Sequence, residues 1–102
     1  MMGNMQQMIK QAQNMQKQMV KVQEEIAQLK FEGSAGGGLV KVTVSGQQVV
    51  EKVELSDKAL EDRELLEDMI LTAINDGLTK SAEESKKRLA AVTGGMKIPG
   101  LF

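Results

Sequence analysis

The sequence predicts a single α+β domain in which a long helix, a small three-stranded antiparallel sheet and a second long helix follow one another. Three observations support this prediction. Apolar residues recur with a helical period through residues 5–29, two Val-rich segments flank a glycine-containing turn, and a second helical period runs from about residue 62 to residue 92. The chain has 102 residues, the size of one domain. We therefore expect one unit, residues 1–102, with tails at 1–4 and 96–102.

The first helix is predicted from apolar residues that are alternately three and four positions apart. They are Met5, Met8, Ala12, Met15, Met19, Val22, Ile26 and Leu29. Gln, Lys and Glu fill most positions between them, and neither Pro nor Gly interrupts the period. If the two long helices pack as an antiparallel pair, we expect the first two Met residues of this apolar face to lie near Leu89 and Val92.

The sheet is predicted from β-branched residues in alternation. A hairpin over residues 39–45 and 49–55 has Gly46 and Gln47 in its turn. A short third strand is predicted at Phe31 and Glu32, and a glycine-rich loop at residues 33–38. The apolar face of the hairpin consists of Val40, Val42 and Val44 on the first strand and Val49, Val53 and Leu55 on the second.

The second long helix begins near Asp62, after a short helical turn capped by Ser56 and Asp57. Asn75, Asp76 and Gly77 by themselves are typical of a tight turn. The apolar stripe keeps its phase across them, so we predict one continuous helix, in which Gly77 costs about 1 kcal/mol relative to Ala. The stripe comprises Leu65, Leu66, Met69, Ile70, Ala73, Ile74, Leu78, Ala82, Ser85, Leu89 and Val92, and Gly94 and Gly95 end the helix.

The composition argues against catalysis. The chain has no Cys and no His, which excludes disulfides, the usual zinc, haem and iron–sulfur sites, and nucleophiles activated by His. Adjacent carboxylates point in different directions on a helix, so no acid–base pair is evident. We expect no enzymatic activity, no cofactor, no metal and no small-molecule substrate. No apolar run approaches the roughly 20 residues of a membrane span, so we expect an intracellular protein without membrane partners.

The total charge of −1 hides an uneven distribution. Residues 1–23 contain three Lys and no acid, and residues 77–102 have five cations against two acids. Residues 61–76, near the predicted sheet, have six acids against one Arg. Basic stretches therefore occupy the two helix ends far from the sheet, either as a solvated surface or as a polyanion-binding surface. Their helical cations are Lys10, Lys17, Lys21, Lys86, Lys87 and Arg88.

Several segments of the chain resemble the YbaB/EbfC nucleoid-associated proteins. They are MQKQM at residues 15–19, QEEIAQL at 23–29, EGSAGGGLVKVTVSG at 32–46, LED at 66–68, AIND at 73–76 and GGMKIPG at 94–100. The resemblance implies a small bacterial α+β protein that forms a tweezer-like homodimer with projecting helical arms. It also implies that the AIND segment lies inside the second helix, where Gly77 stands in place of the Ala common in the family.

The resemblance further implies DNA binding in the cytoplasmic nucleoid, with a possible role in gene expression, through the two long helices. Transferred to this sequence, the binding residues are Lys10, Lys17, Lys21, Lys86, Lys87 and Arg88. We expect sequence-tolerant binding to double-stranded DNA, because Lys outnumbers the guanine-reading Arg by 11 to 2. The alternative is a protein–protein adaptor or chaperone-like clamp that uses the Met-rich first helix.

Overall fold

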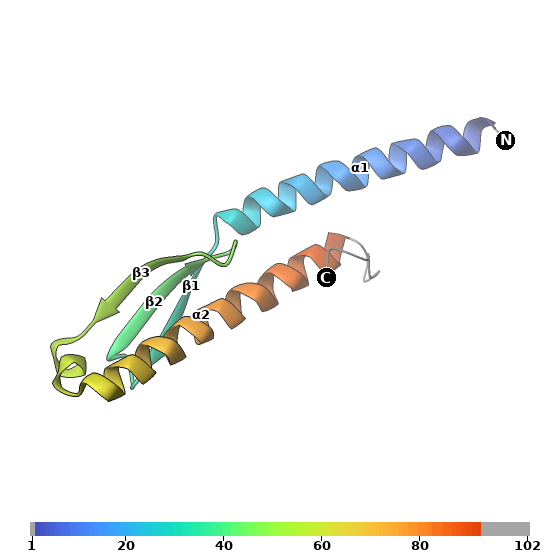
Figure 1. Cartoon of the computed structure of the whole chain (residues 1–102). Helices are drawn as coiled ribbons and strands as arrows, with labels where there is room; N and C mark the ends of the chain where they lie inside the picture. The colour runs from blue at the N-terminus through green and yellow to red at the C-terminus, as the bar shows by residue number, and fades with distance from the viewer. Residues whose placement is uncertain (1, 93–102) are drawn as a thin grey trace.

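The computed structural model describes residues 2–92 and shows a sheet that carries one helix across its face while another projects from the end of the sheet (Figure 1). The elements are α1 (Met2–Ala27), β1 (Lys30–Ala35), β2 (Val40–Ser45), β3 (Val50–Leu55), the 3-10 helix η1 (Asp57–Glu61) and α2 (Arg63–Val92). The predicted α+β order is confirmed. Helix α1 begins at Met2, and the tail predicted at 96–102 lies outside the described residues.

The three strands form one antiparallel sheet in the order β1-β2-β3. Val42, at the centre of β2, pairs with Gly33 on β1 and with Val53 on β3. The register shifts between Thr43 and Val44, so Val50 lies opposite Val44, and Val49, which was predicted to share a face with Val53, precedes the strand. The predicted hairpin is therefore present, with a bulge that the alternation of Val did not reveal.

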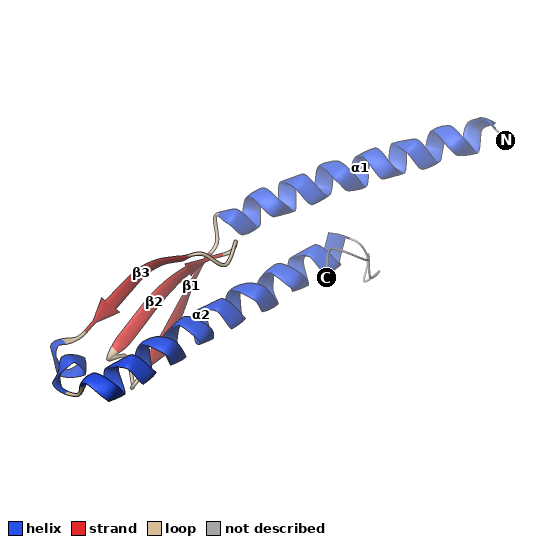
Figure 2. Cartoon of the chain, viewed as in Figure 1, coloured by secondary structure: helices blue, strands red, loops and turns tan. Residues whose placement is uncertain are grey.

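The core lies between the sheet and α2, which crosses the face of β1 and β2 (Figure 2). Val40, Val42 and Val44 are almost completely inaccessible, as their alternation predicted. They pack with Met69 and Ala73 from α2 and with Ala59 from η1. Burial of these side chains is the main force that holds α2 on the sheet, because each Val contributes about 1.5–3 kcal/mol when fully buried.

Helix α2 is continuous through Asn75, Asp76 and Gly77, as predicted. Its buried residues are four positions apart and four of the five are small: Met69, Ala73, Gly77, Ser81 and Ser85. Such a row of small residues lets the helix backbone approach the strands closely. Gly77 therefore has a packing role that offsets its low helix propensity.

The loop predicted at residues 33–38 is shorter than expected, because β1 continues through Ala35. Gly33 is buried inside this strand, where α2 comes nearest, and the turn consists of the three following glycines and Leu39. Gly36, Gly37 and Gly38 all have positive φ angles, between 64° and 96°, which residues with a Cβ rarely adopt. The glycine-rich segment thus serves two purposes, close packing at its start and a left-handed turn at its end.

The direction of α1 is set where it meets the sheet. A Cβ at Gly46, in the β2–β3 turn, would collide with the carbonyl oxygen of Ile26 near the end of α1. The Gly46 N–H donates to the Leu29 carbonyl at 2.9 Å. Ile26 is also the one apolar side chain of α1 classed as fully buried among the described residues. The last turn of α1 is therefore fastened to the β2–β3 turn, while the rest of the helix is free to project.

Helix α2 holds the same turn from the other side. The Ser81 hydroxyl donates to the Ser45 carbonyl at 2.7 Å, and the Ser85 hydroxyl donates to the Gly46 carbonyl at 2.9 Å. Both side chains are buried, so these bonds satisfy polar groups that water cannot reach. The base of the α1 arm is consequently tied to α2 through the backbone of the sheet.

The expected contact between the first Met residues and the end of α2 is wrong. Met5 and Met8 are 66% and 67% exposed, and Val92 instead lies in a crevice with Gln18 and Val22. The physical reason is that α2 spends most of its length on the sheet, so only its last turns remain to lie beside α1. Figure 1 shows α1 continuing well past the end of α2.

Candidate nucleic-acid interface

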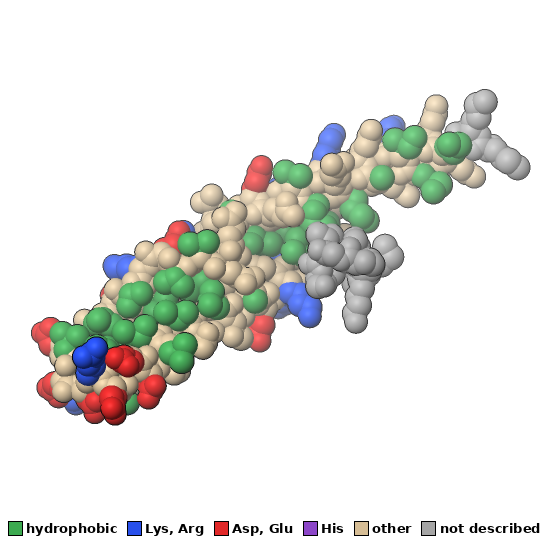
Figure 3. All heavy atoms as spheres, in the orientation of Figure 1, with side chains coloured by type: hydrophobic (Ala, Val, Ile, Leu, Met, Phe, Trp, Pro, Cys, Tyr) green, Lys and Arg blue, Asp and Glu red, His purple; other side chains and the backbone are tan. Residues whose placement is uncertain are grey.

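Charge is separated along the molecule, as the sequence indicated (Figure 3). The acidic residues 61–76 form the end of η1 and the first turns of α2, at the tip of the molecule opposite to the α1 arm. Acidic side chains gather at that tip in Figure 3. This charge distribution therefore repels a polyanion at the acidic tip and favours it at the opposite end, where α1 projects.

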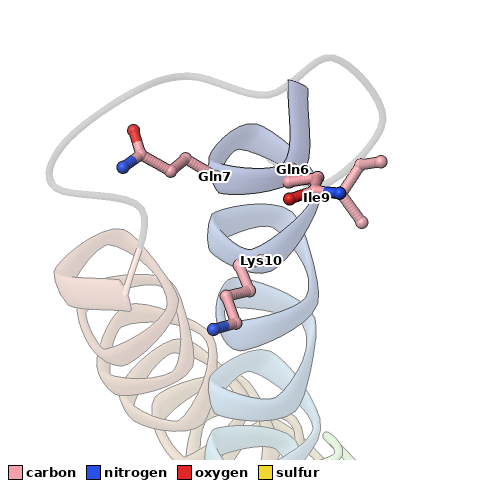
Figure 4. A pocket seen from close by; sticks show the side chains of 4 residues that line it. All are labelled: Gln6, Gln7, Ile9 and Lys10. Atoms are coloured by element: carbon pink, nitrogen blue, oxygen red, sulfur yellow. The ribbon is translucent and has the colours of Figure 1, made fainter. Parts of the chain in front are cut away.

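Three of the candidate residues, Lys10, Lys17 and Lys21, are exposed on α1. Lys10 and Lys17 precede the part of α1 that lines a crevice with α2, so they stand on the projecting arm. Figure 4 shows the side chains of Lys10 and its neighbours Gln6, Gln7 and Ile9 extending outward from α1, where all four are exposed. Within residues 2–92 no ion pair engages these three lysines, which leaves their charges available to a ligand.

The other three candidates lie in the last turns of α2. Lys86 and Lys87 are exposed, whereas Arg88 is partly buried and its Nε donates to Glu84 at 3.0 Å. An i,i+4 pair at a surface contributes only about 0.3–0.5 kcal/mol, so a phosphate can compete for this guanidinium. Arg88 must nevertheless exchange its ion pair with Glu84 for a phosphate, whereas no ion pair is seen for Lys86 and Lys87 within residues 2–92.

The structure brings Lys21 and Arg88 together across the crevice between α1 and α2. The crevice has a volume of about 370 Å³ and is lined by Gln18, Lys21, Val22, Glu25, Arg88, Ala91 and Val92. It unites one candidate from each helix, which the sequence could not establish. Lys10 lies farther out on the arm, so the six candidates form an extended track and not one compact cluster.

Sequence reasoning missed the groups that position this track. Ser85 and Gly46 fix the base of the arm, and Lys80 fastens α2 to the edge strand. The Lys80 ammonium donates to the Glu32 carbonyl at 2.9 Å and lies 3.2 Å from the Asp76 carboxylate. The local signal for this packing was the row of small residues at every fourth position of α2, from Ala73 to Ser85. This row was not recognised, because the prediction followed the apolar residues of the helix.

Helix α2 leaves part of the sheet face uncovered. Val53 and Leu55 lie opposite Val42 and Val40, and directly opposed side chains share a face of the sheet. They are nevertheless 44% and 40% exposed, because α2 covers β1 and β2 and not β3. Figure 3 shows hydrophobic side chains gathered over the end of the molecule that holds the sheet.

These features define a class of protein: a small α+β domain that presents lysine-bearing helical arms at one end and an acidic tip at the other. Among the described residues, no three His, Cys, Asp or Glu side chains come together in a way that would hold a metal ion. In the same residues, no helix is both long and apolar enough to cross a membrane.

The family model described as the YbaB/EbfC DNA-binding family matches residues 2–96, and the chain belongs to this family. Its fold is also similar to that of the uncharacterized protein HP0035 from Helicobacter pylori, which is known from a crystal structure. The two chains are 28% identical, and their superposition has a TM-score of 0.74. The match covers 88% of this chain and 96% of the other. The family supports a nucleoid-associated DNA-binding protein, and the fold and charge separation are consistent with it.

Proposed function

We propose that this protein binds double-stranded DNA, largely independently of sequence, in the cytoplasmic nucleoid, where it contributes to nucleoid organisation and gene regulation. The observation that carries this proposal is the projecting α1 arm, in which residues 2–23 hold three Lys and no acid. The proposed DNA contacts are Lys10, Lys17 and Lys21 on α1 and Lys86, Lys87 and Arg88 on α2.

The proposed mechanism is electrostatic. Lysine ammonium groups neutralise phosphates and release the counterions condensed on the duplex, which makes affinity fall as salt rises. Phosphate contacts position the protein without selecting a sequence. The acidic tip repels the duplex, so contact stays at the arms. The near-zero net charge keeps the overall attraction modest.

The test is DNA affinity as a function of salt for the wild type and for Lys86→Ala/Lys87→Ala/Arg88→Ala. We expect weaker binding and a shallower dependence of log K on log salt, by about 0.9 for each phosphate that the variant no longer neutralises. The matched control is Lys41→Ala/Lys52→Ala/Lys58→Ala, which removes the same charge from the sheet and η1. Equal affinities and slopes for all three proteins would rule out this site.

We also propose that two copies associate through the uncovered face of β3. Val50, Val53 and Leu55 are 37–44% exposed there, and an isolated three-stranded sheet with open edges is a liability in solution. A two-fold contact buries the same strip from both copies and gives the assembly two α1 arms. Such a pair of arms would surround a duplex from two directions.

Sedimentation equilibrium tests this association. We expect a dimer for the wild type and a shift toward monomer for Val53→Lys, because a buried unpaired ammonium is costly. Val20→Lys, an equally apolar and exposed site on α1, is the control and should leave the dimer intact. A wild type that stays monomeric at micromolar concentration would contradict the proposal.

A protein–protein clamp is the second candidate, and one observation favours it: Met5 and Met8 are about two-thirds exposed on the arm. Flexible Met side chains can repack against different partners. Immobilised protein that retains a defined protein partner but no DNA would favour the clamp over DNA binding.

A further inference from the structure

We propose that one face of α1 enters the major groove and prefers A·T-rich DNA, with Gln6, Gln13 and Asn14 reading adenine while Lys10, Lys17 and Lys21 hold the flanking phosphates. This inference rests on the proposed DNA binding and adds a base preference to it. It replaces full sequence tolerance with a moderate selectivity carried by the same arm.

The α1 arm is rich in side-chain amides. Nine of the 20 residues from 4 to 23 are Asn or Gln, and none is acidic. Every side chain from residue 4 to residue 18 is exposed, so these amides do not serve to fill a core. An exposed helix is usually stabilised by oppositely charged i,i+4 pairs, which this stretch lacks because it has no acid. The surface of this stretch therefore offers positive charge and amide hydrogen-bonding groups, both of which a polyanion with hydrogen-bonding groups can engage.

The three amides and the three lysines lie on one face of α1. At about 100° per residue, the six side chains fall within an arc of about 100° on one side of α1, and the Met5–Met8–Met15 side is opposite. From Gln6 to Lys21 this face is about 22 Å long. It ends at Glu24, which falls in the same arc and repels phosphates. The face is therefore a bounded strip of amides and lysines.

The dimensions of α1 match those of the major groove of DNA. A helix with side chains is about 10–12 Å across, and the major groove is about 12 Å wide. The groove accepts α1 because the helix stands clear of α2 for most of its length (Figure 1). Asn and Gln amides pair with the N7 acceptor and the N6 amino group of adenine, whereas guanine presents two acceptors there. Amides at this face thus favour adenine.

The experiment measures competition between an A·T-rich and a G·C-rich duplex of equal length at fixed salt. We expect the wild type to bind the A·T-rich duplex about fivefold or more tightly, the minimum for one bidentate contact. Gln6→Ala/Gln13→Ala/Asn14→Ala should bring the two affinities within about twofold, with the salt dependence unchanged. Ala is the best helix former, so this variant keeps the arm helical, which circular dichroism checks.

Two controls separate base reading from other causes. Gln11→Ala/Gln16→Ala/Gln23→Ala removes three exposed amides from outside the strip and should keep the preference. An A·T-rich duplex made with 7-deazaadenine lacks the N7 acceptor in the major groove but keeps its minor groove, so it should lose the preference.

The outcomes distinguish the two proposals. Equal binding of both duplexes by the wild type, or a preference that survives the triple variant or the 7-deaza duplex, overturns adenine reading and leaves electrostatic DNA binding standing. No binding to any duplex overturns both.

Discussion

Gly33 of β1 and Gly77 of α2 lie backbone against backbone. A Cβ on Gly33 would stand 2.5 Å from the Gly77 nitrogen and would overlap the Ala73 carbonyl oxygen. A Cβ on Gly77 would stand 2.7 Å from Val44 Cγ2 and 3.4 Å from the Gly33 nitrogen. This contact sets the distance between α2 and the sheet, and with it the position of the basic end of α2.

Replacing these glycines should destabilise the fold to different degrees. Gly33→Ala forces backbone apart, so we expect a loss of about 1–3 kcal/mol of unfolding free energy. Gly77→Ala meets a Val side chain that can adjust, and it gains up to about 1 kcal/mol of helix propensity, so its loss should be smaller. Urea denaturation gives both values. A Gly33→Ala protein as stable as the wild type would disprove the close approach.

The buried serines of α2 are expected to stabilise the base of the arm. Ser85→Ala leaves the Gly46 carbonyl without the Ser85 hydroxyl donor, at about 1–3 kcal/mol. Ser81→Ala should cost less, because the Ser45 carbonyl still accepts from the Gln48 N–H at 3.0 Å. Thr79→Ala, at an exposed position of the same helix, is the control and should change little. Chemical denaturation measures stability, and amide exchange at Gly46 reports whether the turn has loosened. Unchanged values for both serine variants would show that the two bonds are weak.

Much of the fold followed from local patterns, because alternating Val and a helical apolar period reflect which side of an element is buried. Val40, Val42 and Val44 were predicted correctly for that reason. The pattern could not show that α2 covers β1 and β2 alone, since Val53 is as apolar as Val42 and yet lies outside the covered area.

The candidate site was only partly predictable. The charge distribution identified the lysines, but the presence of Lys21 and Arg88 in one crevice depends on the angle at which α1 leaves the sheet. That angle is fixed by the Ile26–Gly46 contact, which joins residues far apart in the sequence and has no local signature. The expected Met5–Val92 proximity was wrong for the same reason, because the length of α2 spent on the sheet is a tertiary property.

Acid should weaken the attachment of α2 to the edge strand. The Ser34 N–H and the Lys80 ammonium, 3.1 Å and 3.2 Å from the Asp76 carboxylate, hold the pKa of Asp76 below its ordinary value. A pKa that is lower in the folded than in the unfolded protein stabilises the fold above the unfolded value of about 3.9. The stabilisation is lost as pH falls through the folded pKa.

The Asp76→Asn variant tests this dependence, because Asn resembles the protonated acid. Its melting temperature should lie below that of the wild type near pH 7, and the two should converge in acid once the pH has fallen through the folded pKa of Asp76. Asp68→Asn removes the same charge from an exposed position of α2 and should lower the melting temperature less. A difference between wild type and Asp76→Asn that stays constant with pH would contradict the role of this carboxylate.

The candidate residues of α1 and those of α2 should contribute unequally to the salt dependence of DNA binding. Within the described residues, Lys10 and Lys17 belong to no ion pair, whereas Arg88 is already paired with Glu84. Lys10→Ala/Lys17→Ala should therefore reduce the slope of log K against log salt by about 2 per chain, at about 0.9 for each phosphate contact. Arg88→Ala alone should reduce this slope by less than about 0.9, the value for one phosphate contact. The reason is that Glu84 already neutralises part of the Arg88 charge, so Arg88 must give up this ion pair to bind a phosphate. Titrations between about 50 and 200 mM salt measure both slopes. An Arg88→Ala effect as large as that of the double variant would place the main phosphate contacts at the crevice and not on the arm.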